Sequence, residues 1–186
     1  MKLSSILIAI LFTAVSLPAQ PREGKHKELS LSGSYQNYSS DDGYSSRELF
    51  LISPRLGFFL VEGLEFEPEA IVMFTSGYDP VYALNGNFSY NFISQANGVP
   101  FLLLGYGVAN NVPLVIAPSR TAYSVDILNA GGGLKIFVKE DIAFRFEYRY
   151  QHFWGQRDYT VYGYGTLTDK TDATLHTVQF GFSILL

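Results

Sequence analysis

Apolar and polar residues alternate strictly along the last thirteen residues of the chain, from Thr174 to Leu186. One face carries Val178, Phe180, Phe182, Ile184 and Leu186, and the other carries Thr177, Gln179, Gly181 and Ser183. A period of two residues is the pattern of a β-strand, in which successive side chains point to opposite faces. The C-terminal segment is therefore predicted to be a strand with one apolar face and one small or polar face.

The same alternation recurs along the chain, with turn signals between the segments. It predicts eight strands, at residues 27–38, 47–60, 64–75, 82–93, 100–110, 123–138, 142–154 and 174–186. The clearest is 142–154, where aromatic residues alternate with charged ones. Pro54 interrupts the second strand and cannot donate a hydrogen bond, so a bulge or register slip is predicted there.

The connections between these segments alternate in length. Those at 61–63, 94–99 and 139–141 span three to six residues, whereas those at 39–46, 76–81, 111–122 and 155–173 span six to nineteen. Outer-membrane barrels have short periplasmic turns and longer outside loops. The pattern predicts an all-β fold, an eight-stranded antiparallel up-and-down transmembrane β-barrel. The longest loop, 155–173, is the best candidate for contact with a partner, because loops on rigid scaffolds carry function.

The alternation does not by itself decide which face is inside. A secreted soluble barrel similar to a lipocalin would enclose the apolar face around an apolar ligand, and this alternative stays open. The apolar face is rich in aromatic rings, which are too bulky to fill the inside of an eight-stranded barrel together. We therefore expect it to face lipid, through Phe144, Phe146, Tyr148, Val178, Phe180, Phe182 and Ile184.

The opposite face then lines the lumen and carries charge of both signs. The four acids are Glu65, Glu67, Glu69 and Glu147, and the four bases are Arg55, Lys135, Arg145 and Arg149. The third and seventh strands lie opposite each other in an eight-stranded barrel, so Arg145 and Arg149 are expected to reach the Glu65–Glu69 row. Enclosed charges must be paired, and arginine pairs well with carboxylates. A lumen filled in this way is a plug, although a narrow small-solute channel remains an alternative.

The N-terminus reads as an export signal. Lys2 precedes the apolar run Leu3–Val15, and Leu17–Ala19 offers a cleavage site. We expect a signal peptide at 1–19, a short segment at 20–26 and a barrel domain at 27–186. The chain has no cysteine and a net charge of -4. A disulfide framework is excluded, and nucleic-acid binding, which needs a basic patch, is not expected.

Two stretches resemble the outer-membrane β-barrel family that includes OmpX and the OmpA membrane domain. They are PRLGFFLVEGLEFEPEA at 54–70 and GGGLKIFVKEDIAFRFEYRYQHFW at 131–154. The resemblance implies a place in the Gram-negative outer membrane and insertion by the barrel-assembly machinery. We expect a monomer in contact with outer-membrane lipid and lipopolysaccharide. Such barrels usually end in an aromatic residue, whereas this chain ends in Leu186. We expect the role of the protein to be structural, or to be exerted by its outer loops in adhesion, host interaction or defence.

The segment YRYQHFW also resembles lipid A deacylases, in which the catalytic histidine is followed two residues later by a nucleophilic serine. His152 matches the histidine, but Trp154 occupies the serine position. A serine hydrolase without its serine lacks the attacking oxygen, so no catalytic residue is expected. His152 and His176 could be cross-strand neighbours, but two histidines without a carboxylate are weak evidence for a metal. We expect no metal and no cofactor.

Overall fold

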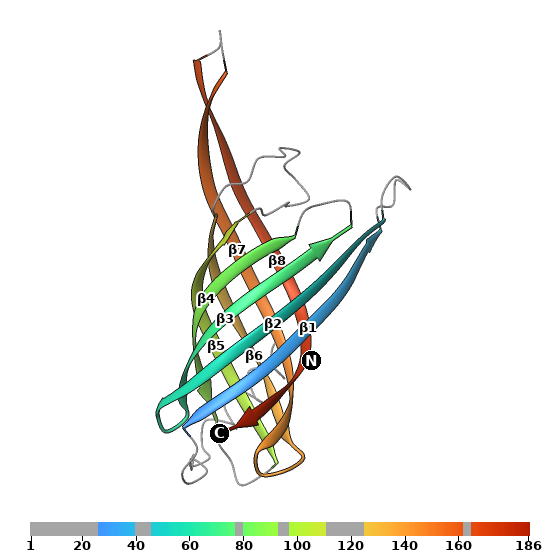
Figure 1. The fold of residues 1–186 in the computed structure, drawn as a ribbon, viewed down its shortest axis with the longest axis vertical. Helices are drawn as coiled ribbons and strands as arrows, with labels where there is room; N and C mark the ends of the chain where they lie inside the picture. Colours follow the sequence, from blue (N-terminus) through green and yellow to red (C-terminus); the bar gives the residue numbers. More distant parts are fainter. Residues whose placement is uncertain (1–25, 40–45, 77–79, 93–96, 111–124, 162–164) are drawn as a thin grey trace, which may run out of the picture.

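The structure is a computed structural model that describes residues 26–39, 46–76, 80–92, 97–110, 125–161 and 165–186. Eight antiparallel strands pair in chain order, and β1 pairs with β8 to close a barrel (Figure 1). The strands are β1 (Lys27–Ser39), β2 (Ser46–Val61), β3 (Leu64–Thr75), β4 (Val81–Asn91), β5 (Gly98–Asn110), β6 (Val125–Phe137), β7 (Ile142–Val161) and β8 (Gly165–Leu185). The prediction of an eight-stranded up-and-down barrel is confirmed. In the described part of the chain, no helix is long and apolar enough to cross a membrane.

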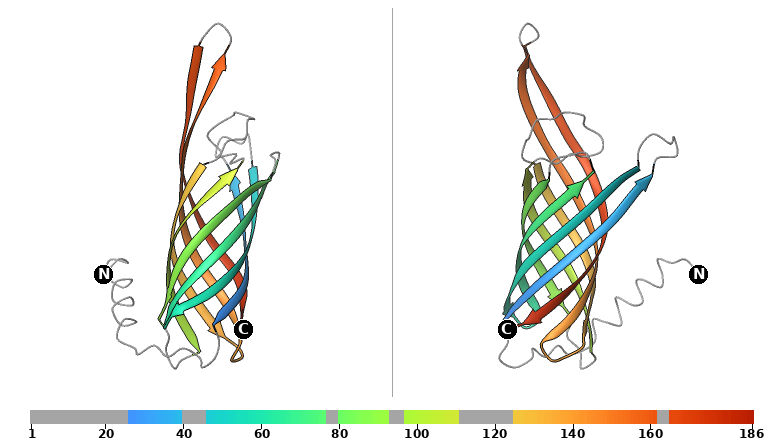
Figure 2. Two further views of the ribbon diagram at one scale, coloured as in Figure 1. Left: turned by 60° about the vertical axis from the view of Figure 1, so that its left-hand side comes forward. Right: turned by 45° about the vertical axis from the view of Figure 1, so that its right-hand side comes forward.

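The two ends of the barrel differ in their connections. The turns between β2 and β3 and between β6 and β7 lie at one end, together with the C-terminus, and we call this the turn end (Figure 2). Gly63 in the β2–β3 turn has a φ of 75°, a conformation that glycine adopts without strain. The opposite end is called the loop end. The predicted signal peptide and the predicted connection at 111–122 lie outside the described residues.

The prediction of a long loop at 155–173 is wrong. β7 continues to Val161 and β8 begins at Gly165, and the two remain in register from Gly155↔Thr171 to Val161↔Gly165. The paired strands rise above the rest of the barrel as a two-stranded hairpin (Figures 1 and 2). Threonine, tyrosine and valine favour strands, but apolar and polar residues do not alternate regularly in the sequence of 155–173, so the pattern that marked the other strands is missing.

The predicted irregularity at Pro54 is also wrong. β1 and β2 pair without a shift through Leu31↔Pro54, and β2 keeps one register with β3 from Ile52↔Val72 to Arg55↔Glu69. The shift lies between Phe59 and Val61, beside the turn. Proline removes a hydrogen-bond donor from the ladder, but it adds no residue, and so the strand keeps its register.

The barrel has an apolar exterior and a polar interior along much of its length. Leu84, Leu104 and Phe180 on the outer wall are 66%, 60% and 58% exposed, whereas Arg145 and Arg149 inside are fully buried. This arrangement is the reverse of the one expected for a soluble lipocalin-like barrel, which would bury its apolar side chains around a ligand. The strand alternation thus separates two surfaces with opposite chemistry.

Candidate functional site

The candidate site is the charged layer of the lumen, which occupies the middle and the turn end of the barrel. The structure places all eight charged residues named above on the inner face, and each is buried. Glu65, Glu67 and Glu69 are alternate residues of β3, and the bases come from β2, β6 and β7. A strand presents every second residue to the same side, which is how short segments bring so many charges into one volume.

Arg55 and Glu147 form the centre of this layer. The Arg55 Nη1 atom lies 2.6 Å from Glu147 Oε2, and Arg55 Nε lies 2.6 Å from Glu69 Oε1. Arg55 Nη2 also donates to Gln179 Oε1 over 2.8 Å. The guanidinium group therefore uses donors on three of its nitrogens, which is the arrangement that offsets the cost of removing a charge from water.

Two arginines of β7 reach carboxylates of β3 across the lumen. Arg145 Nη2 lies 3.0 Å from Glu67 Oε2, and Arg149 Nη1 lies 2.5 Å from Glu69 Oε2. Both also contact Glu147 on their own strand, through Arg145 Nε at 3.0 Å and Arg149 Nε at 2.7 Å. These contacts tie opposite walls together, so the interior at this level is occupied by side chains.

A fifth acid, Glu28 on β1, joins the layer near the turn end. Lys135 Nζ lies 2.6 Å from Glu28 Oε2 and 3.1 Å from Glu65 Oε2. The Arg145 guanidinium carbon lies 4.3 Å from the centre of the Phe101 ring, a cation–π distance. Sequence reasoning missed Glu28, although it shares a face with the small polar residues Ser30 and Ser32 of the same strand.

Neutral polar residues of β4 donate to the carboxylates of β3. Asn85 and Asn87 both donate from Nδ2 to Glu69 Oε2, over 3.0 and 2.9 Å. Ser89 Oγ donates to Glu67 Oε1 over 2.6 Å, and Asn91 Nδ2 donates to Glu65 Oε2 over 3.1 Å. Each acid of β3 is thereby bonded to its neighbouring strand as well as to a base.

The lumen is not polar throughout, and this differs from the sequence-based expectation. Towards the loop end, the inner face is apolar and forms a packed cluster of Leu49, Leu51, Ile71, Met73, Val81, Ala83, Ala109, Val125, Ile127 and Phe153. The sequence contains a sign of this apolar layer, because some strand segments are apolar at every position, as in Ala70–Phe74 of β3. A strand buried on both sides reads as a continuous apolar run, because neither side meets water.

The residues predicted to face lipid lie on the outer wall. Six of them are well exposed there, Phe144, Phe146, Tyr148, Val178, Phe180 and Phe182, while Ile184 on the same face is half-buried. Phe146 and Phe180 pack edge to face across β7 and β8, with ring centres 5.4 Å apart. Aromatic contacts therefore continue along the outside between neighbouring strands.

The two histidines lie on the outer wall but not opposite each other. His152 pairs with Thr174, and His176 pairs with Tyr150, so they are offset by two residues along the strands. His152 stacks on Trp154, with ring centres 5.4 Å apart, and His176 Nδ1 lies 2.6 Å from the Tyr148 hydroxyl. Among the described residues, no group of three histidine, cysteine, aspartate or glutamate side chains could hold a metal ion.

Comparisons with known proteins identify the fold. No family model matches the chain, and no curated protein matches its sequence. The crystal structure of Neisserial surface protein A is similar at a TM-score of 0.60 and 15% identity, covering 86% of this chain and 97% of that one. The N-terminal β-barrel domain of Pseudomonas aeruginosa OprF is similar at 0.56 and 14%, covering 88% and 100%. Similarity at this level of identity shows a shared barrel architecture.

Proposed function

We propose that this chain, which has the fold of eight-stranded outer-membrane barrels, is a closed and non-catalytic barrel of the outer membrane. The observation that carries the proposal is that charged side chains lie inside the barrel and apolar side chains outside, the reverse of a soluble protein. Ion pairs fill the middle of the lumen, and large apolar side chains such as Leu84, Leu104 and Phe180 cover the outside. In water this exterior would be a large aggregation-prone patch, whereas in a bilayer it is solvated by hydrocarbon.

The lumen favours a plug over a small-solute channel. A solute entering from the loop end would first meet the apolar layer around Leu51, Ile127 and Phe153. It would then meet side chains joined across the lumen by Arg145–Glu67 and Arg149–Glu69. A conducting barrel needs a continuous aqueous path, and two filled layers in series oppose one.

The proposed role is that of a scaffold in contact with outer-membrane lipid and lipopolysaccharide. It would act as a monomer, inserted by the barrel-assembly machinery after removal of a signal peptide. The β7–β8 hairpin beyond Gly155 is the element that projects furthest from the barrel (Figure 2). We propose that it and the loops beside it contact an external partner in adhesion, host interaction or defence. The name of one structural neighbour, a surface protein, is in keeping with this role.

The localisation is tested by fractionating cells and comparing boiled with unboiled samples on a denaturing gel. We expect the protein in the outer-membrane fraction, with a mobility that changes on boiling because the ladder of a closed barrel resists detergent. Recovery in the aqueous fraction would support the soluble alternative instead. Closure is tested with purified protein in a planar bilayer, where no steady conductance is expected. Stable unitary steps would support the narrow channel.

A further inference from the structure

The barrel wall is incomplete at the seam where it closes. The β1–β8 ladder runs only from Glu28↔Leu185 to Gly33↔Phe180. Above this point β1 stays paired with β2 as far as Ser39, and β8 stays paired with β7. The two hairpins therefore diverge towards the loop end, as the separation of β1 from β8 shows (Figures 1 and 2).

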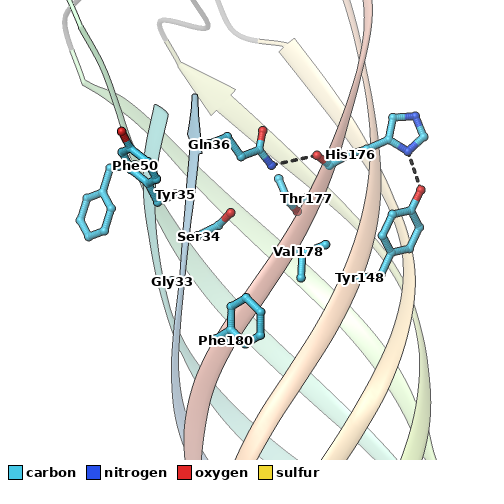
Figure 3. A pocket seen from close by; sticks show the side chains of 10 residues that line it. All are labelled: Gly33, Ser34, Tyr35, Gln36, Phe50, Tyr148, His176, Thr177, Val178 and Phe180. Atoms are coloured by element: carbon cyan, nitrogen blue, oxygen red, sulfur yellow. Dashed lines mark hydrogen bonds between the residues drawn. The ribbon is translucent and has the colours of Figure 1, made fainter. Parts of the chain in front are cut away.

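A groove of about 650 Å³ occupies this seam. It is lined by residues of β1, β2, β7 and β8: Gly33, Ser34, Tyr35, Gln36, Phe50, Tyr148, His176, Thr177, Val178 and Phe180. Figure 3 shows the Gln36 side chain reaching across the gap to the backbone of His176, whose imidazole ring is turned towards Tyr148. Gln36 Nε2 donates to the backbone carbonyl oxygen of His176 over 2.9 Å, so a side chain bridges the strands where the backbone ladder has ended.

The groove has an apolar part and a polar part. Phe50, Val178 and Phe180 are exposed apolar side chains of its lining, continuous with the apolar outer wall. Its hydrogen-bonding side chains are those of Ser34, Tyr35, Gln36 and Thr177 and the bonded pair of Tyr148 and His176. The lining contains no carboxylate, lysine or arginine, so nothing in it selects a strongly charged ligand.

We propose that this groove holds one acyl chain of an outer-leaflet lipid, a proposal that rests on the proposed membrane location. The volume lies within the range of about 300–1,000 Å³ that is typical of small-molecule sites. Empty space beside hydrocarbon forfeits dispersion contacts, which a neighbouring chain recovers by entering. The seam opens towards the loop end, which places it in the outer leaflet. Gln36, Tyr148 and His176 would then lie where a lipid carries its polar linkage.

The test uses the refolded barrel in phosphatidylcholine nanodiscs that contain stearic acid spin-labelled in mid-chain. We expect an immobilised spectral component that saturates at one chain per barrel. Gly33→Leu should fill the groove and weaken this binding by about tenfold or more. The matched control is Gly86→Leu, at another outward-facing glycine of the wall. A Cβ atom at Gly33 or Gly86 would approach its nearest neighbour at 3.2 or 3.4 Å, so either site admits a side chain after small shifts.

A second pair keeps the test decisive if Gly33→Leu does not fold. Val178→Trp fills the groove from β8, and Val108→Trp places the same side chain on the continuous wall of β5; the two valines are 52% and 47% exposed. Equal immobilisation in the groove-filling variants and their controls would overturn the acyl-chain site while leaving the membrane barrel intact. A barrel that fails to insert, judged by flotation with the lipid, would overturn the proposed location and this inference with it.

Discussion

Glu147 contacts three guanidinium groups at once, more cationic partners than any other carboxylate of the described lumen has. Arg55 and Arg149 lie 2.6 Å from its two oxygens, and Arg145 lies 3.0 Å away. Replacing Glu147 with glutamine keeps the shape but removes the negative charge. Because three buried cations would then share fewer carboxylates, we expect a loss of about 3–5 kcal/mol in the free energy of unfolding.

Urea denaturation of the refolded protein in lipid measures this loss for Glu147→Gln. The control is Glu62→Gln, the same substitution at an exposed position of the β2–β3 turn, where a change within about 0.5 kcal/mol is expected. Equal stability of the two variants would show that the buried charges do not hold the barrel together.

Gly105 leaves space for the side-chain amide of Asn87, which donates to Glu69. A Cβ atom there would lie 2.0 Å from Asn87 Oδ1 and 2.9 Å from the backbone oxygen of Gly86. Gly105→Ala is therefore expected to cost about 1–3 kcal/mol through overpacking, measured by the same urea titration. The outward-facing Gly86 tolerates a Cβ at ordinary contact distance from Phe66, so Gly86→Ala should cost clearly less. The reverse order would contradict the packing described for the lumen.

At the scale of strands, alternation predicted most of the barrel because burial differs sharply between the two faces. The sequence expectation for β3 was residues 64–75, and these are its bounds in the structure. The eight charged residues named from the sequence lie inside, since the period of two places them opposite the aromatic face. Glu28 was not predicted, because its neighbours on the inner face of β1, Ser30, Ser32 and Ser34, are uncharged. The ladder partners and ion-pair geometry depend on register, which one sequence does not reveal.

The extension of β7 and β8 could not be predicted from alternation, because beyond Gly155 the hairpin has left the barrel wall. An isolated two-stranded hairpin is marginally stable and adds little to the barrel. We expect that joining Gly155 to Thr171 through a two-residue Asn-Gly turn leaves the free energy of unfolding nearly unchanged. Urea titration and heat-dependent gel mobility check this outcome. Loss of the folded form would show that the extension is needed to complete the barrel.

At the scale of the whole molecule, the barrel has a polar interior and an apolar exterior, and one pair of substitutions tests whether that exterior faces lipid. Leu104 and Val61 are similarly exposed, at 60% and 63%, but they differ in position along the barrel. Leu104 lies midway along β5, paired with Phe88 and Ala130, whereas Val61 ends β2 beside the turn. In water, exposed positions of this kind tolerate arginine with little change in stability. In a bilayer, the free-energy cost of an arginine on the outer wall depends on how deep in the hydrocarbon it lies.

We therefore expect Leu104→Arg to lower the free energy of unfolding in lipid by about 2–4 kcal/mol, and Val61→Arg by about 0–1 kcal/mol. The difference arises because a guanidinium group in mid-wall must be desolvated or must draw water into the hydrocarbon, whereas one at the turn end reaches the interface. Urea titration in lipid vesicles measures both values. Small and equal effects would mean that the wall around Leu104 meets water, and the apolar exterior would then require a protein partner to cover it.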